Sequence, residues 1–209
     1  MKDRAGKIPV QLFQKSDKDS WRAFYHWLGM TAPNLKIAQN LGQRGEKAAF
    51  DYLKRAFRQR YPQQQLKEEP NGKFVIEGGN QIVVEAHWLN AASSQWETRK
   101  ESGESYDIQL IEHDVTHYYE VKATEQRQER DSFDLTEAEW KLAQKQGETY
   151  HILRVYLHEE HAESKSNAEI VVIDDPAALL KEGDLTVRIP NSSSQTVEFF
   201  ASRPAIRQR

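Results

Sequence analysis

An acid and a base lie two positions apart in the segment Tyr118–Thr124, where Glu120 is followed by Val121 and Lys122. Side chains alternate along a strand, so a strand here would direct Glu120 and Lys122 to the same face. The same acidic-x-Lys triplet recurs at 139–141 and 163–165. The former lies in an expected helix, where such positions do not face each other, and the latter in a polar loop.

A second carboxylate, Asp107, opens the expected strand that precedes the Glu-x-Lys strand. Asp107, Glu120, the backbone carbonyl of Val121 and water molecules would form an all-oxygen site suited to Mg²⁺ or Mn²⁺. Lys122 would add positive charge where an attacking water or a phosphoryl oxygen develops charge. These residues predict phosphodiester hydrolysis. The alternative is that Asp107 caps a strand and Glu120 and Lys122 form a surface ion pair.

Glu46 lies at the start of an apolar stripe, at 49, 50, 53 and 57, that predicts an amphipathic helix. The helix would direct this carboxylate along its buried face, and a buried acid needs a partner. We therefore expect Glu46 to support a second metal or Lys122. The alternative is a glutamate at the rim of the core.

Weaker candidates could contact nucleic acid. The exposed side of the same helix would offer cations to backbone phosphates. Thr124 could hold a site water, the helix start at Thr136 could bind a phosphate, and Trp96 could stack on a base. For most of these residues an ordinary structural role is the alternative. The candidates for nucleic-acid contacts are Lys47, Lys54, Arg55, Arg58, Arg60, Thr124, Thr136, Gln144 and Arg154.

The amino-acid composition excludes several classes of functional site. The chain has 209 residues and no cysteine, which excludes disulfides, thiolate metal sites and cysteine nucleophiles. Its net charge of −3 combines +8 in residues 1–65 (13 basic, 5 acidic) with −11 in the remainder (16 basic, 27 acidic). A basic end beside an acidic body is typical of a nucleic-acid footprint next to a metal cleft, or merely of solvated surface.

The apolar pattern and the turn residues predict a mixed α/β sheet flanked by helices. We expect a helix capped by Asn40, a capping box at Thr136 and Glu139, and helix ends at Pro62 and Gly147. The expected helices span 40–60, 136–147 and 176–180. The expected strands span 73–77, 81–89, 106–111, 116–124, 150–157 and 169–173, with edge strands at 185–189 and 197–200.

Three segments are expected along the chain: an extension with a short helix over 1–38, a main domain over 39–190, and a strand and tail over 191–209. No apolar run is long enough to cross a bilayer, and the first residues lack the apolar stretch of a signal peptide. We therefore expect no membrane partner and a cytoplasmic location. No glycine-rich phosphate loop is present in the sequence, so an ATP-driven motor would have to be a partner.

Six blocks in order resemble a known family, the domain at the C-terminus of the plant protein NO VEIN, which also occurs in bacterial restriction and defence proteins. The resemblance covers roughly residues 38–190. The blocks are Gly42–Glu46, Trp88–Asn90, Ser105–Ile108, Tyr119–Thr124, Phe133–Trp140 and Tyr150–Val155.

The resemblance implies membership of the PD-(D/E)XK nuclease superfamily and a restriction-endonuclease-like core. Asp107 would be the motif aspartate, Glu120 and Lys122 the E-x-K pair, and Glu46 the first-helix acid. The proline that the superfamily name places before the aspartate is Tyr106 here. That proline shapes the backbone and is no ligand, so the departure leaves the chemistry intact.

The sequence as a whole predicts a Mg²⁺- or Mn²⁺-dependent nuclease, most consistent with a DNA endonuclease of a bacterial restriction or defence system. RNA is the other possible substrate, and a homodimer is expected by analogy. The main alternative is a catalytically silent module of the same fold that binds nucleic acid or a partner ATPase or helicase. A third alternative is a pure protein-interaction domain.

Overall fold

A computed structural model describes residues 32–79, 81–91, 104–125, 130–158, 168–188 and 194–200. The chain divides into two compact units, Met1–Asn40 and Leu41–Arg209. Trp96 and the expected extension helix before residue 32 lie outside the described residues. No helix in the described ranges combines the length and apolar character required to cross a membrane.

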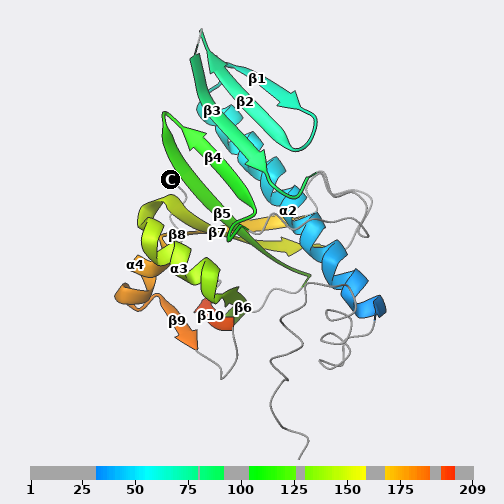
Figure 1. The fold of residues 1–209 in the computed structure, drawn as a ribbon, viewed down its shortest axis with the longest axis vertical. Coiled ribbons are helices and arrows are strands. Elements are labelled where there is room, and N and C mark those ends of the chain that lie inside the picture. The colour runs from blue at the N-terminus through cyan, green and yellow to red at the C-terminus, as the bar shows by residue number, and fades with distance from the viewer. Residues whose placement is uncertain are drawn as a thin grey trace, which may run out of the picture. The chain divides into compact units, whose positions relative to one another are not determined.

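A seven-stranded mixed sheet forms the centre of the second unit, in the order β1-β2-β3-β4-β5-β7-β8 (Figure 1). All neighbours are antiparallel except β5 and β7, which are parallel. The strands are β1 (Gln65–Glu69), β2 (Lys73–Gly78), β3 (Gln81–Trp88), β4 (Ile108–Glu112), β5 (Val115–Thr124), β7 (Tyr150–Leu157) and β8 (Ala168–Asp174).

The parallel pair requires a crossover, because parallel neighbours cannot be joined by a tight turn. The chain leaves β5, forms β6 (Arg130–Thr136) and α3 (Glu137–Gln146), and returns as β7. After β8 come α4 (Pro176–Glu182), β9 (Leu185–Arg188) and β10 (Ser194–Phe200). Strands β6, β10 and β9 form a separate three-stranded antiparallel sheet.

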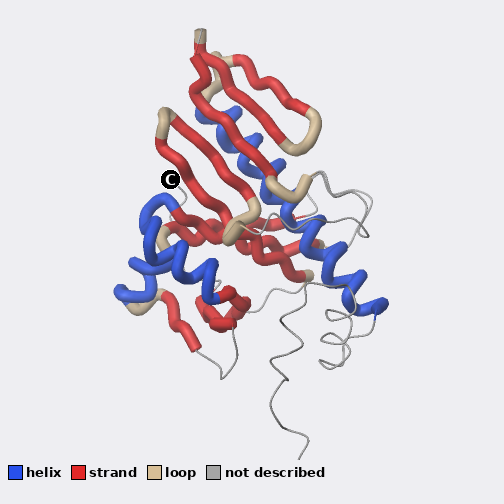
Figure 2. The backbone as a smooth tube through the Cα atoms, viewed as in Figure 1, coloured by secondary structure: helices blue, strands red, loops and turns tan. Residues whose placement is uncertain are grey.

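Helix α2 (Ala32–Arg60) packs from Leu41 onward against one face of the large sheet, and α3 packs against the other face, as the helices in Figure 2 show. One core cluster joins the apolar stripe of α2 to inward residues of β2, β4 and β5, among them Phe50, Phe74 and Val121. The other cluster joins α3 to β6 and β7 through Trp140, Leu135 and Ile152. The two clusters fix the helices that carry the candidate site.

Most expected elements are confirmed, including the β2–β3 and β4–β5 hairpins and the capping box of α3, in which Glu139 N–H donates to the Thr136 hydroxyl. The expected helix start is wrong: α2 already begins at Ala32, so Asn40 lies inside it and caps nothing. Two strands, β1 and β6, were not expected. Strand β1 is too polar to be recognised by its pattern and owes its place to pairing with β2.

Candidate active site

The candidate site begins where strand β4 ends. Pairing between β4 and β5 ends at Ile108 and Tyr119, and one residue earlier the Asp107 N–H donates to the Tyr119 carbonyl at 2.9 Å. The Asp107 carboxylate then accepts the N–H of Val121, with Oδ2 to N at 2.9 Å. The Asp107 carboxylate thus takes the place of a backbone carbonyl of β4 as the acceptor for Val121 N–H. This hydrogen bond fixes the Asp107 side chain at the end of the strand.

Glu120 and Lys122 project from β5 toward α3. Their neighbours Tyr119 and Val121 pack in the cluster under α2, so alternation places the acid and the base on the opposite face, as predicted. Lys122 Nζ lies 2.7 Å from Glu120 Oε1, and the two side chains are 18% and 8% exposed. The two side chains form an ion pair, as the structural alternative expected, but the pair is largely buried and does not lie at the surface.

A third carboxylate reaches Lys122 from α3. Glu139 Oε2 lies 2.9 Å from Lys122 Nζ and also accepts the N–H of Thr136 at 3.0 Å. The sequence indicated Glu139 as the last residue of the capping box and as the acid of the triplet at 139–141, but not as a partner of Lys122. One sequence feature could have suggested this contact. The capping box starts α3 within the crossover that joins the Glu-x-Lys strand β5 to its parallel neighbour β7.

Glu46 approaches from the opposite face of the sheet, on α2. It is only 5% exposed, as the apolar stripe predicted, and it accepts the Trp88 indole N–H at 2.8 Å. Gly45 lets the helix come this close, since a Cβ at this position would overlap the Cβ of Ala123 on β5. No sequence pattern indicated that Trp88 donates a hydrogen bond to Glu46.

The cluster holds four carboxylates and one ammonium group. Burial, followed by the charge of Glu46, raises the pKa of Asp107 to about 7. Burial also raises the pKa of Glu120 well above its usual range, although Lys122 opposes that shift. Burial disfavours the charge of Lys122, but Glu120 and Glu139 outweigh this effect and raise its pKa. The negative charge in the cluster therefore exceeds what one lysine balances.

A hard divalent cation fits this donor set. The Asp107 and Glu120 carboxylates offer oxygens at the strand end, where Asp107 Oδ1 also accepts the Asn90 amide at 3.3 Å. Mg²⁺ commonly takes only one or two protein carboxylates while it keeps several waters. The N–H and C=O of one residue in a strand point to the same edge, so the Val121 carbonyl shares the edge on which Asp107 lies. Within the described ranges, no three His, Asp or Glu side chains make a complete protein-built metal site. Asp107 and Glu120 would need water to complete the coordination.

The cations on the exposed side of α2 are mostly tied to nearby groups. Lys47 pairs with Asp51 at 2.7 Å. Lys54 Nζ lies 3.0 Å from Glu68 Oε2, and Arg60 Nη1 lies 2.9 Å from Glu112 Oε1. Any phosphate would have to compete with these partners.

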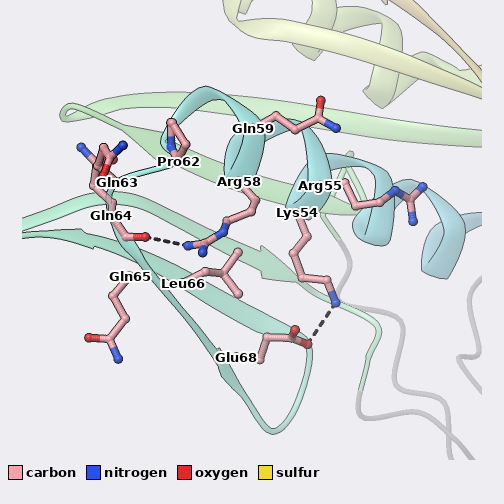
Figure 3. A pocket seen from close by; sticks show the side chains of 10 residues that line it. All are labelled: Lys54, Arg55, Arg58, Gln59, Pro62, Gln63, Gln64, Gln65, Leu66 and Glu68. Carbon is pink, nitrogen blue, oxygen red and sulfur yellow. Dashed lines mark hydrogen bonds and ion pairs between the residues drawn. The ribbon is translucent and has the colours of Figure 1, made fainter.

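A polar pocket lies beside this surface, lined by the last turns of α2, the turn at Pro62 and strand β1 (Figure 3). Arg58 donates to the Gln64 carbonyl at 2.6 Å within it, and Lys54 reaches Glu68. Arg55, also at the pocket, is exposed and forms no ion pair with another described residue. None of the carboxylates of the candidate site lines this pocket.

The other predicted nucleic-acid contacts lie in different environments. Thr124 is partly buried on the same strand face as Glu120, and Gln144 is exposed on α3. Thr136 uses its hydroxyl to cap α3. Arg154 is only 5% exposed: it donates to the Lys122 carbonyl at 3.0 Å, and its guanidinium lies over the ring of Phe133. Arg154 thus supports the Lys122 strand from the inside, which leaves little of it for a ligand.

Histidines meet away from the candidate site although their sequence spacing gave no sign of it. His117 Nδ1 and His151 Nε2 are 3.0 Å apart on β5 and β7, and His151 Nδ1 lies 2.7 Å from Asp174 Oδ1. The parallel register of the two strands brings the rings together.

Comparison with known proteins gives one family. The family model described as "Protein NO VEIN, C-terminal" matches residues 45–170. Protein NO VEIN of Arabidopsis thaliana is 30% identical over 184 residues, which is 86% of this chain and 5% of the plant protein. The chain therefore spans about one twentieth of the length of that relative. No solved structure matches.

Proposed function

The chain belongs to the family of the C-terminal domain of Protein NO VEIN, and on that premise we propose that it is a metal-dependent nuclease that hydrolyses phosphodiester bonds, with DNA as its substrate. The observation that carries the proposal is the meeting of Asp107, Glu120 and Lys122 at one strand end. Asp107 and Glu120, 13 residues apart in the sequence, lie close enough there to repel each other. The excess of negative charge favours a bound cation.

The order of elements supports assignment to the PD-(D/E)XK superfamily. A helix with a buried acid precedes an antiparallel meander, and a crossover helix leads to a strand parallel to the last strand of the meander. The carboxylates lie on that meander, and the lysine follows the second carboxylate after one residue. We propose that this is a restriction-endonuclease-like core.

In this proposal, Asp107, Glu120 and the Val121 carbonyl hold Mg²⁺ or Mn²⁺, which would lower the pKa of a bound water and offset charge on a phosphoryl oxygen. Lys122 orients the attacking water and adds positive charge beside the developing phosphorane. Glu46 adds negative charge near Asp107 and is itself oriented by the Trp88 indole. The side chains of Glu120 and Lys122 are largely buried, which strengthens the electrostatic interactions between them.

Substrate approach is assigned to the basic side of α2 and to Arg55 in particular. Phosphates would displace surface partners such as Asp51 or Glu68, so affinity should fall steeply with added salt. A homodimer that cuts both strands, and an ATPase or helicase partner in a restriction or defence system, remain parts of the proposal. They rest on the family resemblance.

The test is nicking of supercoiled plasmid with Mg²⁺, Mn²⁺ or EDTA. Wild-type protein should nick only with metal, and Asp107→Asn and Glu120→Gln should lose the activity. Glu137→Gln is the matched control, because Glu137 is an exposed acid of α3 that pairs with Lys141. Salt-sensitive DNA binding without cleavage in either metal would identify the silent binding module instead. Absence of both would favour the protein-interaction domain.

A further inference from the structure

We infer that Glu139 is a positioning residue of the candidate site, which holds the Lys122 ammonium group through the first turn of α3 and so leaves Glu120 available to a cation. The inference rests on the proposed function for its catalytic meaning. Its physical content, a specific coupling between Glu139 and Lys122, stands on contacts of described residues.

Lys122 lies between two carboxylates. Its Nζ is 2.7 Å from Glu120 Oε1 and 2.9 Å from Glu139 Oε2. A cation bound to Glu120 would repel the ammonium group and would compete with it for the same carboxylate. Glu139 offers the ammonium group an alternative partner that is no proposed metal ligand. Lys122 can therefore release Glu120 without becoming an unpaired buried charge.

Glu139 is suited to this role because its own position is fixed. The same Oε2 atom accepts the N–H of Thr136 at 3.0 Å, while the Glu139 N–H donates to the Thr136 hydroxyl at 3.2 Å. Reciprocal capping of this kind holds the side chain at the helix start. The position of Lys122 is consequently linked to the start of α3.

Capping alone does not require a carboxylate at this position. Glutamine serves equally well as the last residue of a capping box, and Glu137 already supplies an acid to the first turn of α3. The side chain of Glu139 is nevertheless 13% exposed and directed at Lys122, whereas that of Glu137 is 64% exposed and pairs with Lys141. The negative charge of Glu139 thus serves Lys122 rather than the cap.

The test compares Glu139→Gln, which retains the capping geometry, with Glu137→Gln. Glu139→Gln should unfold at a modestly lower temperature than Glu137→Gln, because it removes one partner of the largely buried Lys122 ammonium group. Calorimetric titration with Mn²⁺ should show affinity reduced about tenfold in Glu139→Gln only, the range seen when groups that orient metal ligands are removed. In plasmid cleavage, kcat should fall about tenfold with KM nearly unchanged, because the substrate-binding surface is intact.

A double-mutant cycle and a spectrum separate this inference from the nuclease proposal. Unfolding of Lys122→Met, Glu139→Gln and the double variant should reveal coupling between the two positions, and the Lys122 ammonium signal in a ¹⁵N-lysine NMR spectrum should shift in Glu139→Gln. Coupling without cleavage by the wild type would overturn the nuclease and leave the inference standing. Cleavage with no coupling, no shift and unchanged Mn²⁺ affinity would overturn the inference alone.

Discussion

The carboxylate cluster and the exposed side of α2 differ in how their charged side chains are paired and how far they are buried. On α2, Lys47 and Arg60 each have an acidic partner, and these pairs lie at the surface. In the cluster, Glu120 and Glu139 contact Lys122, Asp107 and Glu46 add further negative charge, and the Glu120 side chain is only 8% exposed. The charges on α2 are paired and exposed, whereas those of the cluster are largely buried and carry an excess of negative charge.

The difference separates charge that stabilises little from charge that costs stability. Exposed ion pairs typically contribute about 0 to 1 kcal/mol, so the α2 pairs explain little of the fold. Buried carboxylates in excess of their partners are unfavourable, and the raised pKa values of Asp107 and Glu120 express that cost. The proposed cation would relieve the cost, which is why the cluster and not the basic surface carries the functional proposal.

The largest difference between the two regions is expected when a lysine of each is replaced and plasmid cleavage is measured. Lys122→Met should reduce metal-dependent plasmid cleavage by about 100-fold or more, since a fixed charge at the reacting phosphate is lost. Lys47→Met, which removes a surface cation, should change the rate at saturating DNA less than about twofold, because its loss weakens DNA binding and not the chemical step. Equal losses in the two variants, measured as initial nicking rates, would contradict the distinction between the regions.

A glycine pair on α2 tests how the cluster is assembled. Gly45→Ala should lower the free energy of unfolding by about 2 kcal/mol, because the new methyl overlaps Ala123 and pushes Glu46 away from the strand end. Gly42→Ala meets no atom within 4 Å and should instead add up to about 1 kcal/mol through helix propensity.

Urea unfolding of both glycine variants is the measurement. Ala123→Gly added to Gly45→Ala should restore part of the loss, since it removes the methyl on the strand side. If Gly45→Ala were as stable as Gly42→Ala, α2 would not lie against β5 as closely as described.

The pH dependence of the free energy of unfolding should distinguish the buried carboxylate of Asp107 from an exposed one. The pKa of Asp107 is raised from 3.8 to about 7, so its contribution to metal-free stability is fully present below pH 4 and is lost as the pH rises through 7. Relative to wild type, Asp107→Asn should therefore gain about 1 to 2 kcal/mol between pH 4 and pH 8 in EDTA. Asp114→Asn, in an exposed turn, is the control. If the stability of both variants changed with pH in the same way, the pKa of Asp107 would not be raised.

The smallest effect is expected for the surface pairs. A double-mutant cycle of Lys47→Ala and Asp51→Ala should give a coupling of about 0.3 to 0.5 kcal/mol, which should vanish in molar salt. Urea unfolding with and without added NaCl measures it. A coupling above about 1 kcal/mol that persists in salt would show that the basic side of α2 is structural as well.

The sequence anticipated those parts of the site that follow from local rules. Strand alternation placed Glu120 and Lys122 on one face, and the apolar stripe placed Glu46 on the buried side of α2. The capping rule located the start of α3 at Thr136. Each of these predictions depends on residues within a single helix or strand.

The remaining parts depend on contacts between distant segments. That Glu139 serves both a cap and Lys122 depends on where the crossover seats α3, and that Asp107 bonds Val121 N–H depends on where pairing of β4 and β5 stops. Cations of α2 were predicted as free phosphate contacts because the sequence does not reveal Glu68 and Glu112 as their neighbours. Arg154 was predicted at the surface because a charged side chain usually lies there.

The hydrogen bond between the Asp107 carboxylate and the Val121 amide makes that amide a natural reporter of the site. The proton lies within the peptide backbone, so a ¹⁵N-enriched sample shows it in a ¹H–¹⁵N correlation spectrum without any attached probe. A change in the charge of Asp107, or a ligand drawn to its other oxygen, would alter the strength of this hydrogen bond and shift the resonance. One backbone signal would thus follow occupancy and protonation of the strand end in the unmodified protein.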